Sequence, residues 1–563
     1  MTNMVQAAGD ELSNLVGAAY ETAVAEGALP AGAAAVGTIE IPKDASHGDY
    51  TSGFALAAAR QLKLPPRKIA EQILPRLGLE GSYFKSAEVA GAGFINLRLA
   101  DTWYRQVLSS IEEDGETYGS VDEGRGKKVM VEFVSANPTG TMTIGNARGG
   151  VLGDALASIL ERAGYDVWRE FYVNDAGNQV ELFARSLEAR YLQLFLGDKA
   201  SGIPENGYHG EDIVTLAGIF RNVYGDRYLK ADEAERRQVM MEFGLKYNIE
   251  KMRADLERYG ITYDEWFRES SLHESGYVED TIRILVEKGY TYEKDGALWF
   301  RVTDFGAEKD EVLRRSTGGY TYFAVDMAYH RNKFQVRGFD RVIDVLGADH
   351  HGHALRFKKG ITALGIDNSR LEFLIMQLVH LTRDGETVKV SKRTGKAIAL
   401  SDLLDEISVD AARFWFNSRP NTHLEFDMGL AVRQDSENPV YYVQYAHARI
   451  CSLISALALE GAEVPASSGI DASLLSTEVE HELIKQLSQL PEEVRLVARE
   501  LDPSRINRYL IELAARFHRF YTSNRLKGAD PEVLSARLKL ADSVRAVLEN
   551  GLKLIGVSAP VKM

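Results

Sequence analysis

Apolar residues recur at two spacings along this chain of 563 residues, and segments with the two spacings alternate. An apolar run of strand length occupies residues 128–134, and further strand-like segments occupy 165–173, 341–346 and 371–381. Between the runs of each pair, apolar positions recur at helical spacing, over 144–164 and over 353–364. Two strand–helix–strand units predict a doubly wound parallel sheet of the Rossmann type, with a large insertion between its halves.

Other patterns flank this sheet. Helical spacing over 56–74 and a strand-like run at 94–99 predict a small α+β domain at the N-terminus. A charged helical stretch fits the insertion, the strand signal disappears after residue 401, and amphipathic helices fill the C-terminus. We therefore predict a multidomain α/β chain, divided into an N-terminal domain at 1–120, the sheet domain at 121–400 with its insertion at about 192–297, a connecting segment at 401–435 and an all-α domain at 436–563.

Composition narrows the class of protein. Hydrophobic residues make up 45% and charged residues 26%, as in ordinary globular proteins. No run approaches the ~18 apolar residues that span a membrane, and no leader pattern opens the chain. The single cysteine, Cys451, excludes an internal disulfide framework and a cysteine zinc cluster. We expect a cytoplasmic protein with no membrane partner. The net charge of −15 leaves a nucleic-acid partner open, because binding depends on the phosphates contacted locally.

A polar, glycine-rich run separates the first predicted strand from its helix. Residues 135–150 read Ser-Ala-Asn-Pro-Thr-Gly-Thr-Met-Thr-Ile-Gly-Asn-Ala-Arg-Gly-Gly. Free backbone N–H groups and the helix dipole make such a position an anion site, and Gly145 lets a ligand approach the backbone closely. Taken alone, the run fits an ordinary strand-to-helix turn equally well.

A basic run follows the last predicted strand of the sheet. Residues 389–396 read Lys-Val-Ser-Lys-Arg-Thr-Gly-Lys, with four cations in eight residues. This composition suits a loop that closes over phosphates, and it also suits a solvated basic loop. The glycine-rich run upstream of the same sheet favours the phosphate interpretation.

Together the two runs resemble the signatures of class I aminoacyl-tRNA synthetases, His-Ile-Gly-His and Lys-Met-Ser-Lys-Ser. Residues 143–146 occupy the first signature and 389–393 the second. Further stretches resemble arginyl-tRNA synthetases specifically and extend the resemblance over essentially the whole chain: 131–153, 171–179, 320–330, 347–353 and 441–449. The resemblance implies ATP-dependent ligation of L-arginine to tRNA(Arg) through an arginyl-adenylate, with Mg²⁺ arriving on ATP, and a monomeric enzyme.

The resemblance also assigns roles to individual residues. The catalytic positions are Thr143, Asn146, Lys389 and Lys392. The arginine positions are Glu132, Tyr322 and Asp326 at the guanidinium and Asn137 and His350 at the α-ammonium. The ATP positions are Gly145, Gly347, Asp349, His351 and Ser391. The tRNA positions are Phe94 and Asn96 at the D-loop and Tyr442, Tyr445 and Arg449 at the anticodon.

The residue chemistry agrees with several of these roles. A guanidinium is a planar five-donor fork, so its pocket needs directional carboxylates, and Tyr322 and Asp326 stand four apart on one helical face. Unpaired RNA bases stack on aromatic side chains, as Tyr442 and Tyr445 would allow. For Phe94, a buried strand position is an equally good interpretation. The histidines within 347–353 invite a zinc site, but two are adjacent in sequence and no further ligand cluster is evident, so we expect no metal ligation there.

Thr143 departs from the family, which usually has histidine at this position. Threonine keeps a donor hydroxyl but is shorter and cannot be cationic, and loss of one preorganised donor costs about 10²–10³ in rate. The chain is therefore a compensated active enzyme, an impaired tRNA-binding paralogue or an engineered variant. A class I synthetase for another amino acid is a further alternative. We favour the active arginine enzyme, because the other expected site residues are present.

Overall fold

The computed structural model describes residues 3–33, 37–197, 200, 202–383, 385–388, 398–420 and 422–563. Its centre is a five-stranded parallel sheet in the order β12-β11-β5-β6-β7. The strands are β5 (Lys128–Glu132), β6 (Asp166–Val173), β7 (Glu265–Arg268), β11 (Arg341–Gly347) and β12 (Leu371–Met376). The strand order reverses between β5 and β11, and ligands bind at the carboxyl ends of the strands at such a switch point. The predicted doubly wound α/β fold is confirmed.

Helix α5 (Ile144–Arg162) crosses over from β5 to β6. Glycines on its inner face let it approach the sheet closely: a Cβ built on Gly153 would lie 2.2 Å from Phe133 Cγ. Helices α11 (Tyr322–Arg331) and α12 (His351–Gly360) belong to the second half of the fold. The segment just after α11, Asn332–Val336, winds as a π-helix.

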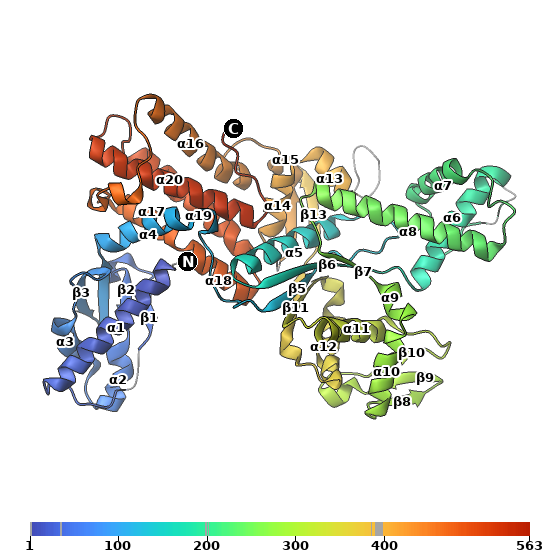
Figure 1. The fold of residues 1–563 in the computed structure, drawn as a ribbon, viewed down its shortest axis with the longest axis horizontal. Coiled ribbons are helices and arrows are strands. Elements are labelled where there is room, and N and C mark those ends of the chain that lie inside the picture. The colour runs from blue at the N-terminus through green and yellow to red at the C-terminus, as the bar shows by residue number, and fades with distance from the viewer. Residues whose placement is uncertain are drawn as a thin grey trace.

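The N-terminal region forms a separate unit, at the lower left of Figure 1. Its four-stranded sheet, ordered β1-β2-β4-β3, packs with three of the four helices of this region, α1, α2 and α3. The elements are α1 (Met4–Ala25), β1 (Ile39–Glu40), β2 (Tyr50–Ser52), α2 (Phe54–Leu62), α3 (Pro66–Ile73), β3 (Phe84–Ala90), β4 (Phe94–Leu99) and α4 (Asp101–Asp114). The helical pattern over 56–74 divides into α2 and α3, because Pro65 and Pro66 cannot continue a helix but suit the start of one.

The segment predicted as an insertion holds more than helices. Helices α6 (Asn178–Leu196), α7 (Glu211–Tyr224) and α8 (Glu233–Arg258) project to the right in Figure 1. Residues 265–268 then return to the central sheet as its edge strand β7. A lobe follows, made of α9 (Glu269–Glu274), α10 (Tyr277–Glu287), β8 (Thr291–Lys294), β9 (Ala297–Phe300) and β10 (Glu311–Arg314).

Two expectations about strands are wrong. The run 371–381 is not one strand: β12 ends at Met376, and β13 (Val379–Arg383) joins another sheet, ordered β14-β13-β15. Strand structure also continues after residue 401, because β15 (Leu424–Asp427) pairs in parallel with β13. This strand is four residues long, too short for a periodic signal. The sheet also includes β14 (Glu386–Thr387), with α13 (Leu400–Glu406), α14 (Val409–Asn417) and α15 (Met428–Ala431) nearby.

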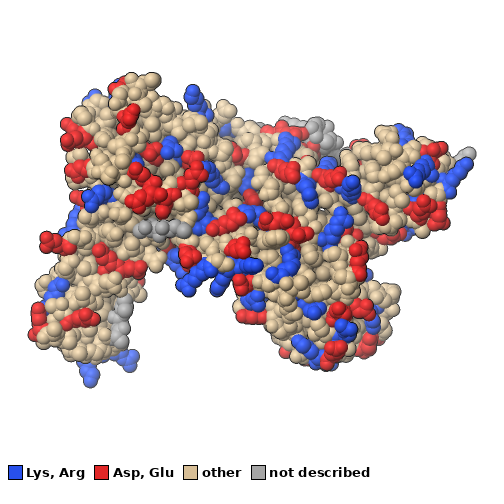
Figure 2. Space-filling model, in the orientation of Figure 1, with Lys and Arg blue, Asp and Glu red and all other residues tan. Residues whose placement is uncertain are grey.

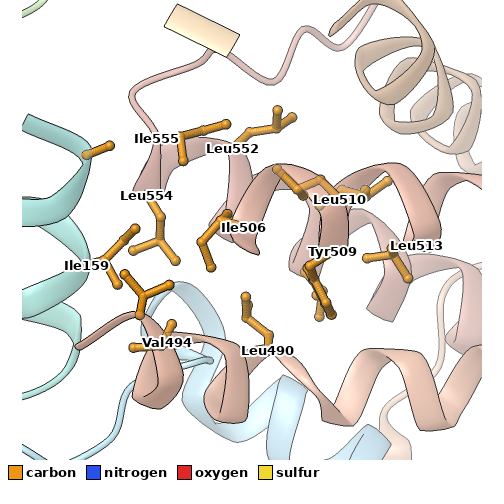
Figure 3. Close-up of a cluster of buried hydrophobic side chains, with 14 of the residues drawn as sticks. Ile159, Leu490, Val494, Ile506, Tyr509, Leu510, Leu513, Leu552, Leu554 and Ile555 are labelled. Atoms are coloured by element: carbon orange, nitrogen blue, oxygen red, sulfur yellow. The ribbon is translucent and has the colours of Figure 1, made fainter. Parts of the chain in front are cut away.

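The C-terminal region is all-helical, as predicted, with α16 (Pro439–Leu459), α17 (Glu478–Ser488), α18 (Leu490–Glu500), α19 (Ser504–Ser523) and α20 (Pro531–Leu554). Figure 3 shows its core meeting Ile159 of α5 beside Val494, Ile506 and Leu554. Ile159, Val494 and Ile506 are fully buried, so α5 shares one continuous core with this domain. Of the helices in the ranges given above, none combines the length and apolar content needed to cross a membrane.

Candidate active site

The N-terminus of α5 lies at the switch point and is closed by a capping box. Thr143 is the N-cap residue, and both its backbone N–H and its hydroxyl donate to Asn146 Oδ1, at 2.9 and 2.8 Å. The backbone N–H of Asn146 donates in return to Thr143 Oγ1 at 3.3 Å. A backbone N–H can only donate, so the atom facing Thr143 is the amide oxygen. Asn146 Nδ2 therefore keeps its N–H donors, and no described residue accepts from them.

The chain that follows the second signature run returns to this helix end. Residues Lys389, Ser391 and Lys392 lie outside the described part of the chain. The residue that follows this gap by two positions, Ala399, forms an antiparallel bridge with Thr143. Above the helix end, a Cβ on Gly145 would meet no described atom closer than Thr143 Oγ1, at 3.5 Å. The surface beside Gly145 is open to a ligand.

A tight turn carries the chain from β5 to α5. Val134 and Ser135 have φ of 69° and 41°, a backbone conformation that is costly for a β-branched residue. The Ser135 hydroxyl donates to Glu132 Oε1 at 2.9 Å and accepts from the backbone N–H of Tyr172 at 3.1 Å. The turn thereby fixes Glu132 at the end of β5. Further along the turn, Asn137 donates to Gln179 Oε1 at 2.7 Å.

Helix α11 carries both Tyr322 and Asp326. Tyr322, the first helical residue, is 53% exposed. Asp326 Oδ2 lies 2.8 Å from Nε2 of His353 on α12. This hydrogen bond raises the pKa of His353, against the opposing effect of burial. Sequence reasoning considered His353 only as a zinc ligand and missed that it is the partner of Asp326.

We expect arginine binding to strengthen with pH because of this pair. Protonated His353 competes with a guanidinium for Asp326, and its raised pKa moves that competition above 6.5, the ordinary value for histidine. The arginine KM should therefore fall as pH rises from about 6 to 8, and the fall should flatten in His353→Gln. ATP–pyrophosphate exchange with tRNA present measures this KM. If the arginine KM changes equally with pH in the wild type and in His353→Gln, His353 does not compete with the substrate for Asp326.

The raised pKa of His353 also makes the stability of the fold depend on pH. A histidine whose folded pKa exceeds its unfolded value stabilises the fold fully below the unfolded value and loses that contribution as pH rises through the folded value. His353 therefore contributes most below about pH 6.5.

The remaining predicted ATP and ammonium positions follow β11. Gly347 ends the strand and His351 begins α12. Between them, Asp349 and His350 lie in an exposed 3₁₀ turn, with His350 Nε2 3.5 Å from Asp349 Oδ2. His351 also borders a cavity of about 550 Å³ between α12, β12 and the end of α18. Within the described ranges, no three His, Cys, Asp or Glu side chains gather as a metal site.

Arg148 is a buried residue of the first signature run that sequence reasoning passed over. It is fully buried on α5, and its guanidinium donates to five backbone carbonyl oxygens, those of Gln377, Leu378, Arg419, Pro420 and Thr422. Burial lowers its pKa to about 10. Arg148 thereby ties the α5 N-terminus to the link between β12 and β13 and to the segment before β15. The only signal in the sequence was its place within the motif.

An aromatic surface on the helical domain contains the predicted anticodon residues. On α16, the rings of Tyr441 and Tyr445 stack at 6.0 Å, and Arg449 lies beside Tyr445. From α19, His518 packs against Tyr442 at 4.9 Å, and Tyr521 lies 4.2 Å from the Arg449 guanidinium. Tyr445 is 37% exposed. Sequence reasoning singled out the basic-aromatic stretch 516–521 but assigned no role to His518 or Tyr521, because their partners are distant in sequence.

The two predicted D-loop residues have different surroundings. Phe94 begins β4 and is exposed, as a base-stacking residue would be. Asn96 is buried in the same strand, and its Oδ1 accepts a hydrogen bond from the Thr51 hydroxyl at 2.8 Å. Contact of either residue with RNA stays a prediction. Figure 2 shows acidic and basic side chains interspersed, with basic ones gathered in the concave middle beside the N-terminal unit.

Family models match three parts of the chain. Residues 107–427 match the tRNA synthetases class I (R) catalytic domain, and residues 443–563 match the DALR anticodon binding domain. Residues 10–99 match the arginyl tRNA synthetase N terminal domain. The switch-point sheet with its capped helix end is thus the catalytic domain of a class I aminoacyl-tRNA synthetase.

Full-length relatives fix the family. The arginine–tRNA ligase of Caldanaerobacter subterraneus subsp. tengcongensis is 53% identical and that of Acetivibrio thermocellus 50%, each covering 100% of both chains. The structure of Thermus thermophilus arginyl-tRNA synthetase has the same fold, with a TM-score of 0.73 at 22% identity over 99% of this chain and 100% of that one. The chain belongs to the arginyl-tRNA synthetase family and is an enzyme that ligates arginine to tRNA.

Proposed function

We propose that this ligation takes place at the switch point, between the N-terminus of α5 and helix α11. The arginine carboxylate attacks the α-phosphate of ATP in line, which gives arginyl-adenylate and pyrophosphate. The terminal adenosine hydroxyl of tRNA(Arg) then attacks the adenylate and releases AMP. Neither step needs a side-chain nucleophile, so the protein acts by positioning and by stabilising charge. The observation that carries the proposal is that one tight turn at the switch point fixes Glu132 at the carboxyl end of β5 and leads into the capped N-terminus of α5.

Arginine is held between two elements. Asp326 and Tyr322 from α11 and Glu132 from β5 bind the guanidinium, because carboxylates accept its fork directionally. Asn137 and His350 hold the α-ammonium. The amide of Gln179, which accepts from Asn137 at 2.7 Å, orients it for this contact.

ATP lies across the helix end. Gly145 lets the nucleotide approach the backbone, and Gly347, Asp349 and His351 contact the ribose and adenine. Asn146 Nδ2 donates to the phosphates in the orientation that Thr143 imposes, which compensates for the missing histidine. Lys389, Ser391 and Lys392 bind the phosphates from the basic loop. Mg²⁺ arrives bound to ATP: the ion commonly keeps waters and phosphate oxygens as ligands and takes few carboxylates from the protein.

The tRNA contacts both outer domains. The N-terminal domain, residues 1–120, meets the D-loop through Phe94 and Asn96. The helical domain, residues 436–563, receives the anticodon, whose bases stack on Tyr442 and Tyr445 while Arg449 meets phosphate or base. We propose a cytoplasmic monomer.

Variants at Thr143 test the role of the capping box. Thr143→Val keeps the side-chain shape but removes both hydrogen bonds of the hydroxyl, so Asn146 is oriented only by a backbone N–H. We expect kcat for aminoacylation to fall about 10²-fold, with little change in arginine KM. Loss of the cap should cost about 1 kcal/mol of stability. Thr143→Ser, which keeps the hydroxyl, should retain most of the rate.

The matched comparison is aminoacylation by the wild type and Thr143→His side by side. Charging by the wild type at a rate within about tenfold of Thr143→His supports a compensated enzyme. A wild-type rate equal to that of Thr143→Val would show that the hydroxyl plays no part. Undetectable charging by both the wild type and Thr143→His, with tRNA still bound, would support the impaired paralogue instead.

A further inference from the structure

Four carboxylates form a row across the central sheet beneath the arginine site. Asp344 on β11, Glu132 on β5, Glu170 on β6 and Glu265 on β7 are successive paired positions. Paired residues of a parallel sheet point to the same face, and neighbouring strands lie about 4.8 Å apart. Asp344, Glu132 and Glu170 are buried, at 4%, 9% and 0% exposure. Like charges this close and this dry require cations.

One short segment supplies those cations. Lys333 lies in the π-helical turn that follows α11, and its side chain is fully buried. Its ammonium is 2.5 Å from Glu132 Oε2 and 3.0 Å from Asp344 Oδ1, and it lies 4.2 Å from the centre of the Tyr329 ring. Four residues on, Arg337 makes a two-pronged ion pair with Glu170. π-helical turns often occur at functional sites, and this one aims two cations at the carboxylate row.

The same segment is linked to Asp326. His330 Nε2 lies 2.8 Å from Asp344 Oδ2, and His330 Nδ1 lies 3.0 Å from the backbone oxygen of Asp326. Helix α11 therefore carries one proposed guanidinium-binding carboxylate, and the turn that follows it holds the other, Glu132, through Lys333. Asp326 and Glu132 come from elements almost 200 residues apart, and the Lys333 side chain reaches Glu132 from the turn that follows the helix of Asp326.

The hydrogen bonds of Glu132 show what this link achieves. A carboxylate has about two lone-pair positions on each oxygen. Lys333 occupies one on Oε2, and the Ser135 hydroxyl occupies one on Oε1. Among the described residues no other donor contacts Glu132, so one acceptor position remains on each oxygen, the pair that a guanidinium fork takes. Each oxygen of Glu132 is thus fixed by one protein donor and can still accept a hydrogen bond from the substrate.

We propose that Lys333 is a positioning residue for arginine recognition, which orients Glu132 and keeps it ionised for the substrate guanidinium. This inference rests on the proposed role of Glu132. Lys333 contacts no substrate atom in it. Its effect on arginine passes entirely through the Glu132 carboxylate.

Lys333 is the strongest of the charges that favour the ionised form of Glu132. Burial and Asp344 leave the pKa of Glu132 raised above its ordinary value, while Lys333 and His330 limit that rise, so loss of Lys333 would raise the pKa further. Burial lowers the pKa of Lys333, but Asp344 and Glu132 outweigh it and raise the pKa to about 12, so the ammonium stays charged. The other titratable groups that face Glu132 are the hydroxyls of Tyr172, Tyr263 and Tyr329.

The test is a double-mutant cycle on arginine KM, measured by ATP–pyrophosphate exchange with tRNA present. Lys333→Met should raise the arginine KM about 30-fold or more, the effect of removing one partner of a buried charge pair, with a smaller change in kcat. Arg337→Met is the matched control: it removes a half-buried cation at the end of the same turn, one that pairs with Glu170. Its arginine KM should stay within about threefold of the wild type.

The cycle separates positioning from a general structural effect. If Lys333 acts through Glu132, the variant with both Lys333→Met and Glu132→Gln has the same arginine KM as Glu132→Gln alone. The proposal would be overturned if the KM increases of Lys333→Met and Glu132→Gln multiplied in the double variant. Equal KM increases in Lys333→Met and Arg337→Met would overturn it as well. An unchanged KM in Glu132→Gln itself would instead refute the proposed role of Glu132. If Lys333→Met does not fold, the charge-balanced pair Lys333→Met with Asp344→Asn replaces it under the same criteria.

Discussion

Replacing Asp326 by asparagine should lower kcat/KM for arginine about 10³-fold, mainly through KM, because a guanidinium loses a charged acceptor inside a partly dry pocket. The substitution keeps the shape of the side chain and can still accept from His353. The fall in kcat/KM therefore measures the effect of removing the carboxylate charge and not of changing the side-chain volume. ATP–pyrophosphate exchange with arginine varied and tRNA present gives both constants.

A surface carboxylate provides the control for Asp326. Asp280 lies on α10 of the same lobe and pairs with Arg283 on the helix surface, with its side chain 52% exposed. Exposed ion pairs contribute little, so Asp280→Asn should leave kcat/KM within about twofold of the wild type. A drop of less than tenfold in Asp326→Asn would remove Asp326 from the guanidinium site.

The second large effect concerns the structure that supports the site. Arg148→Leu removes a fully buried side chain that donates to five backbone carbonyl oxygens, in hydrogen bonds that are buried or part-buried. We expect the free energy of unfolding to fall by about 3–5 kcal/mol, because each buried acceptor left unsatisfied costs about 1–3 kcal/mol and water re-enters only in part. Aminoacylation should fall as well, since the link between β12 and β13 leads into the basic loop.

Denaturation in urea, followed by circular dichroism, measures this change. Arg148→Lys keeps the charge but cannot reach several carbonyls at once, so it should be nearly as unstable as Arg148→Leu. Arg185→Leu, at an exposed position of α6, is the control and should change the midpoint little. Equal urea midpoints for Arg148→Leu and Arg185→Leu would show that the Arg148 guanidinium does not hold α5 to the segments that carry its carbonyl partners.

Comparison with the sequence interpretation shows which features follow from local patterns. The helix expected at 144–164 is α5, at Ile144–Arg162, and the strand expected at 94–99 is β4, at Phe94–Leu99. Both have enough residues for apolar spacing to reveal the period. Strand β15 has four residues and forms by pairing with β13, more than forty positions earlier, so no local pattern marks it.

The candidate site divides in the same way. The motifs place Thr143 and Asn146 at a helix start, and the structure adds that Asn146 Oδ1 faces Thr143. Lys333 sits in the run His-Arg-Asn-Lys, which reads as a solvated basic turn. Its burial depends on Glu132 and Asp344, which the fold brings from strands 201 and 11 positions away.

The sequence by itself thus determines the family, the reaction and the α/β architecture, because these follow from motifs and from the periodicity of apolar residues. The tertiary structure alone decides which charges meet. A buried ion pair forms only when desolvation is offset by a partner at hydrogen-bonding distance, and that distance is set by packing between elements far apart in the chain. Lys333 acquires its role in this way, and Arg148 and His353 acquire theirs through hydrogen-bond partners that packing brings from other elements.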